Sequence, residues 1–296
     1  MTDAVSIDDL SPPKHDKLRR GFFRFRQSKL SLLGGVLVAM VLFFAVFGAI
    51  LAPYPEHIAG GVDTANRFIA PSWAYPFGTN ELGQDVLSLV MAGTTVSVLA
   101  GFGVVLIGSI IGTVVGAVAG FAGGWVDEVL MRLTDLTLTI PGLILAMAIA
   151  AALGPGFGNM VIAISLSWWP GYARLVRGEV LAAREEVYVT AARAIGATPR
   201  RILFRHILPN TVSPIIVKMS LDMGFAILTV AGLGFIGIGV RPPTPEWGTL
   251  LSISRSYMPD YWWTAMAPGM AMFVAVFGFN LLGDGLRDVL DPKARR

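Results

Sequence analysis

The amino-acid sequence predicts an all-α integral membrane protein with about six transmembrane helices, and three observations support this fold class. The chain of 296 residues is 54% hydrophobic and only 15% charged, whereas soluble domains carry about 25% charged residues. Several long stretches contain no charge, and a helix needs roughly 20 apolar residues to cross a bilayer. Lys and Arg are concentrated in a few polar segments, which is typical of cytoplasmic loops.

The uncharged stretches define the expected spans in chain order. The first two stretches each have room for one span. The uncharged interval from Asp135 to Arg174 has room for two, because the stretch GPGFGN within it is a turn signal. The fourth span contains Pro170, which predicts a kink or an early exit from the membrane. The expected spans are 30–52, 96–121, 133–153, 160–176, 212–239 and 263–282.

The positive charges predict the orientation of the chain. Lys and Arg gather before the first span, between 174 and 205, and after the sixth span. The positive-inside rule therefore places both termini and the 174–205 segment in the cytoplasm. The predicted organisation is a cytoplasmic N-terminal tail (1–29), a first transmembrane helix (30–52), an external loop (53–92), a transmembrane core (93–285) with a cytoplasmic loop at about 177–209, and a cytoplasmic C-terminal tail (286–296).

Four glycines on the second span are spaced four residues apart, so they form one stripe along a helix. Such a stripe lets another helix approach closely, and van der Waals contacts then hold the two together. The stripe is either a permanent packing surface or an interface that slides during a conformational cycle. It consists of Gly108, Gly112, Gly116 and Gly120.

Charged residues at membrane depth are functional candidates, since each costs roughly 2.5–3.5 kcal/mol on insertion scales. Lys218 and Asp222 are four residues apart, so they share a helix face and can pair. Asp222 has either a structural role in this pair or a role on a translocation path. Asn280 is a second candidate for that path, or it marks the cytoplasmic exit of the sixth span. Asp135 is expected to form a helix-end ion pair with Arg132.

The sequence also excludes several chemistries. It contains no cysteine, so disulfides and thiolate sites are excluded. No Lys follows a Gly, so the chain has no GxxxxGK[ST] loop to hold ATP phosphates. The three histidines lie in separate segments and no catalytic motif occurs, so we expect no metal site, no catalytic residues and no bound cofactor. A nucleic-acid partner is not expected. The few ionisable groups in the spans argue against a self-sufficient ion-coupled carrier.

The segment EEVYVTAARAIGATPRRILFRHILPN, between the fourth and fifth spans, is predicted to form a helix–turn–helix elbow. Apolar residues recur at helical spacings from about Gly178, and Gly196 is expected to end that helix. Thr198 and Pro199 are suited to the N-cap and the first position of the next helix. Pro209 is expected to break the chain before the fifth span. The pattern alone supports docking on a partner and lying on anionic lipid equally.

One pattern in this elbow is specific. Thr190-Ala191-Ala192 is followed by Gly196 and then by HILP, which ends at Pro209. The pattern resembles the signature E-A-A, three residues, G, nine residues, I-x-L-P of the permease subunits of ABC importers in the dipeptide/oligopeptide/nickel family, with Thr190 in place of Glu. The resemblance covers about 23–293 and is to the C-type peptide permease subunit of this family. Its other stretches are FGTNELGQDVLS (with Gln84 where Arg is usual), GGWVDEVLMRL, WPGYARLVRGEV, PPTPEWGTLLS and FNLLGDGLRDVLDP.

The resemblance implies a type I ABC importer permease fold in a bacterial or archaeal plasma (inner) membrane, and a transport subunit that is not an enzyme. It implies a heterodimer with a second homologous permease, two ATPase subunits that hold ATP and magnesium, and an extracytoplasmic solute-binding protein. Di- or oligopeptides are the implied substrate; nickel, glutathione, opines and oligosaccharides are the alternatives. The residues implied to couple to an ATPase are Val187, Tyr188, Thr190, Ala191, Ala192, Arg193, Gly196 and Ala197.

Overall fold

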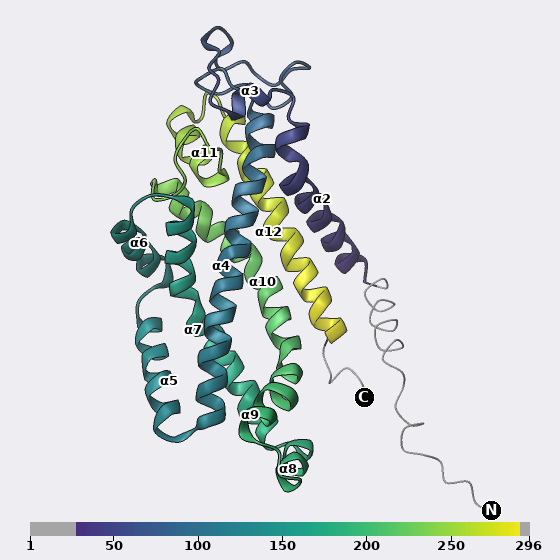
Figure 1. Ribbon diagram of the computed structural model, residues 1–296. Helices are drawn as coiled ribbons and strands as arrows, with labels where there is room; N and C mark the ends of the chain where they lie inside the picture. The colour runs from purple at the N-terminus through teal and green to yellow at the C-terminus, as the bar shows by residue number, and fades with distance from the viewer. Residues whose placement is uncertain (1–27, 291–296) are drawn as a thin grey trace, which may run out of the picture.

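The computed structural model describes residues 28–290, and every regular element in this part of the chain is helical (Figure 1). The predicted all-α class is confirmed for these residues. The elements are α2 (Lys29–Leu51), α3 (Pro55–Ile58), η2 (Thr64–Asn66), α4 (Val86–Ala122), α5 (Gly124–Thr139), α6 (Gly142–Leu153), α7 (Phe157–Arg184), α8 (Val187–Ala194), α9 (Pro199–Arg201), η3 (Ile202–Ile207), α10 (Leu208–Ile236), α11 (Trp247–Ser254), η4 (Arg255–Tyr257) and α12 (Trp263–Leu290).

The helices within residues 28–290 support four or five membrane spans, whereas six were predicted. Within residues 28–290, four helical stretches are long and apolar enough to cross a membrane. They are α2, α4, the α9–α10 stretch and α12. A fifth span results when the bent pair α5–α6 is counted as one. The more polar helix α7 is not in this set, so a sixth span stays a prediction.

The third span, predicted at 133–153, is not one continuous helix. The chain forms α5 and α6 there, and their axes meet at 90°. Pro141 is the cause, because a proline disfavours the helical conformation of the residue before it. Ile140 is accordingly extended, with φ −90° and ψ 127°. At Pro170, where a kink or an early exit from the membrane was predicted, the helix does not end, because α7 continues through this residue to Arg184.

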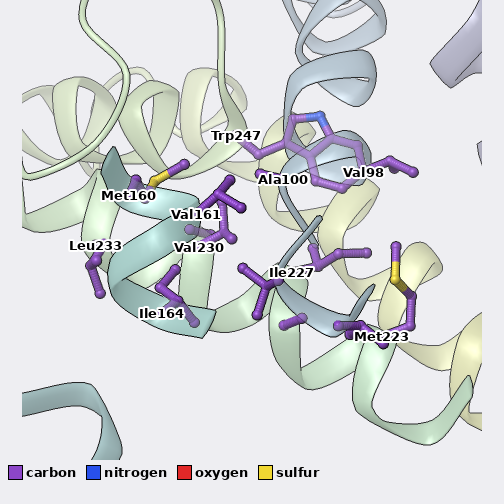
Figure 2. Close-up of a cluster of buried hydrophobic side chains, with 14 of the residues drawn as sticks. Val98, Ala100, Met160, Val161, Ile164, Met223, Ile227, Val230, Leu233 and Trp247 are labelled. Atoms are coloured by element: carbon purple, nitrogen blue, oxygen red, sulfur yellow. The ribbon is translucent and has the colours of Figure 1, made fainter. Parts of the chain in front are cut away.

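The centre of the bundle is α4, which contacts α2, α7 and α10. Figure 2 shows how their buried side chains meet, with Val98 of α4, Ile164 of α7 and Ile227 of α10 in one cluster. Trp247, the first residue of α11, lies beside Val98 of α4 in this cluster and is only 1% exposed. The outward surface is also apolar; Ile50 on α2, for example, is 78% exposed. A bundle that is apolar inside and outside suits a lipid environment.

The two ends of the bundle carry different elements (Figure 1). Helix α8 lies at one end, and the first residues of α2 and the last residues of α12 are on the same side of the bundle. Helices α3 and α11 lie at the other end. The basic N-terminal residues and the chain beyond Leu290 are outside the described residues. Because α12 runs to Leu290, the first part of the predicted C-terminal tail is helical.

The predicted external loop is a folded segment whose end forms the first turns of α4. The Gln84 side chain braces it, donating to the Gly61 carbonyl at 2.8 Å and accepting from the Asn80 amide at 2.9 Å. The Asp85 backbone N–H donates to Nδ1 of His57 at 2.9 Å. Asp85 then caps α4, because its carboxylate accepts from the backbone N–H of Ser88 at 2.8 Å.

Candidate functional site

The elbow is centred on α8, which projects at one end of the bundle between α7 and α9 (Figure 1). Its inner face is held by apolar packing. Val189 is fully buried and Ala192 is 5% exposed, and both pack in one cluster with Ile202, Leu203 and Ile207 of η3. The elbow is therefore packed against η3, the turn that leads into α10.

The outer face of the elbow is open and apolar. Val187 is 82% exposed and Ile195 is 86% exposed, which is unusual for large apolar side chains at a polar end of a protein. The predicted continuous helix from Gly178 is wrong, because the chain breaks at Glu185 and Glu186 and so turns Val187 outward. Of the predicted coupling residues, Val187, Tyr188, Thr190, Ala191, Arg193 and Gly196 are exposed, Ala197 is half-buried and Ala192 is buried.

The turn of the elbow depends on Gly196. Its φ is +81°, a conformation that L-residues with a Cβ rarely adopt. The Gly196 N–H donates to the Arg193 carbonyl and the Ala197 N–H donates to the Ala192 carbonyl, both at 3.0 Å. This pair of hydrogen bonds is a Schellman motif, which ends a helix by satisfying its last carbonyls. Thr198 then caps the next helix, accepting from the backbone N–H of Arg201 at 3.4 Å.

The elbow continues directly into a long rod. Elements α9, η3 and α10 form one helical stretch, Pro199–Ile236. The predicted break at Pro209 is wrong, since this proline lies near the start of α10 just after the π-helical turn η3. A π-helical turn is wider than an α-helical one and is frequent at functional sites. The rod joins the surface elbow to the interior of the bundle without an intervening loop.

The glycine stripe of α4 lies against α7. A methyl group at Gly108 would be 3.4 Å from the Cβ of Trp168, and one at Gly120 would be 3.0 Å from the Arg177 carbonyl. At Gly112 and Gly116 it would collide with the α7 backbone, at the carbonyls of Trp169 and Ala173 respectively. Only a hydrogen fits at these two positions, so α4 and α7 are in backbone contact along the stripe.

Lys218 and Asp222 pair on α10, at 3.0 Å between Lys218 Nζ and Asp222 Oδ2. Lys218 Nζ also lies 4.9 Å from the ring centroid of Tyr172 on α7, a cation–π distance. The Tyr172 hydroxyl is buried, and no hydrogen-bond partner for it occurs among residues 28–290. The three side chains form a polar cluster between α7 and α10, two helices that the elbow connects.

The other predicted polar residues lie apart from this cluster. The Asn280 amide donates to its own helix, at the Val276 carbonyl, at 3.0 Å. The predicted pair of Asp135 with Arg132 is wrong. Asp135 instead pairs with Arg174 of α7 at 2.6 Å, while Arg132 pairs with Glu128 at 3.4 Å. The reason is the orientation of α5, which turns Asp135 toward α7.

Two polar clusters were not predicted from the sequence. Arg177 of α7 makes two hydrogen bonds to the Asp127 carboxylate of α5, at 2.5 and 2.6 Å. Arg184 donates to the Gly120 carbonyl at 2.8 Å and so covers the end of α4. Asp127 has Glu128 beside it and Arg132 five residues further on, so no local pattern singled out Arg177 as its partner.

Glu246 forms the second cluster, in the PEWG stretch that starts α11. It is fully buried, and its carboxylate accepts from the backbone N–H groups of Gly248 at 2.8 Å and Thr249 at 2.9 Å. Burial raises the pKa of Glu246, and the hydrogen bonds from Gly248, Thr249 and Ser97 oppose that rise only in part. A charged residue flanked by Pro and Trp was the available signal for this helix cap.

Together these features define a multi-pass membrane protein that carries a surface elbow on one of its long helices. Residues 112–296 match the family model described as binding-protein-dependent transport system inner membrane component. Residues 18–71 match the model described as the N-terminal transmembrane domain of oligopeptide transport permease C.

Curated relatives match over nearly their whole length. The chain is 43% identical over 267 residues to the "Probable D,D-dipeptide transport system permease protein DdpC" of Escherichia coli (strain K12), covering 90% of this chain and 89% of that protein. It is 41% identical over 291 residues to the "Glutathione transport system permease protein GsiD" of Escherichia coli O6:K15:H31, covering 98% and 94%. The same figures hold for GsiD of Shigella boydii serotype 4.

The chain therefore belongs to the family of binding-protein-dependent transport system inner membrane components, and within it to the ABC permeases of the peptide type. It is a multi-pass protein of the inner membrane. The resemblance read from the elbow and the other quoted stretches is confirmed.

Proposed function

We propose that this chain is one half of the transmembrane pathway of an ATP-driven importer of short peptides, with six spans and both termini in the cytoplasm. A second, homologous permease forms the other half. Two ATPase subunits, which hold ATP and magnesium, bind on the α8 side. A solute-binding protein delivers the peptide on the α3 side. The chain itself hydrolyses nothing and binds no cofactor.

The observation that carries this proposal is the elbow on its rod. The outer face of α8 exposes Val187 and Ile195 beyond the membrane-spanning helices, while its inner face is fixed to η3. A partner that moves α8 therefore moves α10 as a rigid body. From Pro199 to Asp222 the rod is about 35 Å long, at 1.5 Å per residue. Closure of two ATPases below would shift the Lys218–Asp222 region above.

The substrate route is proposed along the face of α10 that carries Lys218 and Asp222, and Asn280 of α12 is a second candidate, on the opposite side of α10. A methyl group on Gly224, half a turn beyond Asp222, would lie 3.3 Å from the Asn280 amide nitrogen. The ion pair is partly exposed, with 31% of the Lys218 side chain and 17% of the Asp222 side chain accessible. A peptide carries one charge of each sign at its ends, which such a pair can recognise.

Short peptides are the proposed substrate class because both relatives are named for them, one for a D,D-dipeptide and one for glutathione. Thr190 stands at the position where the family signature has Glu. Docking of α8 would then depend on the shape of its apolar outer face more than on an ion pair from this position.

The proposal is tested by isolating the full-length chain from its native membrane together with the proteins bound to it. We expect a second permease and an ATPase in the complex, and ATP-dependent uptake of a labelled dipeptide in liposomes that also receive the solute-binding protein. Uptake by the chain alone, driven by a proton or sodium gradient, would instead identify a self-sufficient carrier and overturn the proposal.

A further inference from the structure

We propose that the open cavity lined mainly by α2, α4 and α12 is a binding site for one acyl chain of a membrane phospholipid, in the leaflet on the α3 side of the bundle. The cavity has a volume of about 560 Å³. This size is typical of ligand sites, which occupy about 300–1,000 Å³. The site lies away from the Lys218–Asp222 cluster and from the elbow, so it stands apart from the proposed transport route.

The lining is hydrocarbon in character. Among the described residues that line the cavity there is no charged side chain, and Thr94 supplies the single hydroxyl. That hydroxyl donates to the Val90 carbonyl at 2.9 Å. The indole N–H groups of Trp247 and Trp263 donate to the carbonyls of Val90 at 3.1 Å and Thr79 at 3.1 Å. A peptide would find almost nothing to pair with its charged ends, because a buried unpaired charge is very costly. An acyl chain needs no such partner.

The dimensions fit a chain lying along the helices. On α12 the lining extends from Trp263 to Val274, about 16 Å at 1.5 Å per residue. One leaflet of hydrocarbon is roughly 15 Å deep, half of the 30 Å core. A partner helix does not fit, because one turn of helix, about 5.4 Å long and 11 Å across, already fills roughly 500 Å³. The cavity is therefore too small for a helix to enter, whereas a slender flexible chain fits.

The methionines of the lining suit an occupant of variable shape. Met40 of α2 and Met266 and Met270 of α12 are 41%, 54% and 50% exposed. Unbranched thioether side chains adapt to irregular ligands. Trp262, at the loop end of the cavity, is 51% exposed and marks the interfacial level where a headgroup would leave the site.

A photoreactive phospholipid with a diazirine on its acyl chain tests the site in liposomes that contain the full-length chain. We expect adducts on the α12 peptide that contains Met266 and Met270, and saturable labelling that unlabelled phospholipid competes away. Ala267 lines the cavity, whereas a side chain at Gly269 on the same helix has nothing within 4 Å. Ala267→Phe is therefore expected to lower this labelling several-fold, and Gly269→Phe is the matched control.

Three results would overturn the proposal. The first is labelling of the α12 peptide in the unmodified protein that unlabelled phospholipid does not reduce, because such labelling indicates contact with bulk lipid only. The second is equal labelling in folded Ala267→Phe and Gly269→Phe variants. The third is cross-linking of a photoreactive group at Met270 to a neighbouring protein in the native complex, because a protein would then cover the cavity. The competition experiment uses the unmodified chain, so it decides the matter even where Ala267→Phe fails to fold.

Discussion

The hydroxyl of Ser97 donates a hydrogen bond of 3.2 Å to the Glu246 carboxylate, joining α4 to the first turn of α11 across 149 positions of sequence. The same hydroxyl accepts from the Trp247 backbone N–H at 3.2 Å. Glu246 also fits closely against Gly234 of α10, where no side chain could be accommodated. One buried carboxylate thus fixes three helices at the α3 end of the bundle, far from the elbow.

Replacement of Glu246 should show how much its helix cap contributes to the unfolding free energy. The variant Glu246→Ala removes the acceptors for two backbone N–H groups, so we expect a loss of about 0.5–2 kcal/mol of unfolding free energy. The variant Glu246→Gln keeps one acceptor and should lose less. Both can be measured by the thermal shift of tryptophan fluorescence, to which Trp247 contributes from within the cluster.

The raised pKa of Glu246 also predicts a pH dependence. The folded protein holds this proton more tightly than the unfolded chain, so the unfolding free energy is highest below the unfolded pKa of about 4.3. It falls as pH rises from there through the raised folded pKa, and then levels off. Glu246→Gln should lack this part of the pH dependence. An identical pH profile for both proteins would show that the carboxyl is not shifted.

The backbone contact between α4 and α7 is tested by adding single methyl groups. Gly112→Ala places its Cβ against the Trp169 carbonyl and the Tyr172 Cβ, and overpacking of this kind costs about 1–3 kcal/mol. The matched control is Gly232→Ala on α10, where nothing lies within 4 Å. That change should be neutral or stabilising by up to about 1 kcal/mol, because alanine favours a helix over glycine. Equal melting temperatures would contradict the close contact.

The spacing of these glycines predicted their common helix face, but not which helix they meet. Composition and uncharged length likewise predicted α2, α4, α10 and α12, since hydropathy is a local property of the chain. The bend was missed although Pro141 is a local signal for it, because the uncharged interval was divided at the GPGFGN turn alone. Partners such as Asp135 with Arg174 depend on how α5 packs on α7, which no local pattern contains.

The ion pair between α5 and α7 should contribute to stability, unlike its exposed neighbour. The side chains of Asp127 and Arg177 are 17% and 34% exposed, so Asp127→Asn leaves a partly buried guanidinium without its carboxylate partner. We expect this change to lower the unfolding free energy by about 1–3 kcal/mol. Glu128→Gln breaks the Glu128–Arg132 pair, whose side chains are 68% and 77% exposed. It should cost less than about 1 kcal/mol. Denaturation of both variants in one detergent makes the comparison.

A role of Asp222 on the substrate route predicts a loss of uptake at normal protein level. Asp222→Asn keeps the size of the side chain and removes the charge that faces Lys218, so peptide uptake should fall while membrane insertion is retained. The variant with both Lys218→Met and Asp222→Leu removes the pair without leaving a single buried charge. If this double variant transports normally, the pair is structural and the route lies elsewhere.

The elbow shows the same limit of sequence reasoning on a smaller scale. Gly196, Thr198 and Pro199 were assigned correctly because turn and cap residues act locally. The inward orientation of Ala192 was not foreseen, since it follows from the break after Arg184 that restarts the helix with a new face. Within the signature, Ala191 is therefore the alanine available at the surface.

Gly196 gives the sharpest test of coupling. Its φ of +81° strains any β-branched residue, although a side chain there would meet nothing within 4 Å. Gly196→Val should therefore leave the helix bundle inserted but distort the turn after α8, so that ATP hydrolysis by the complex no longer drives uptake. Asn tolerates the left-handed conformation better than other residues, so Gly196→Asn should retain most of the uptake. The measurement is the number of peptides taken up per ATP hydrolysed in liposomes. Full coupling in Gly196→Val would show that the turn of the elbow plays no part in the mechanism. Equal losses in both variants would show that any side chain at this position blocks docking, so that the left-handed turn is not what matters.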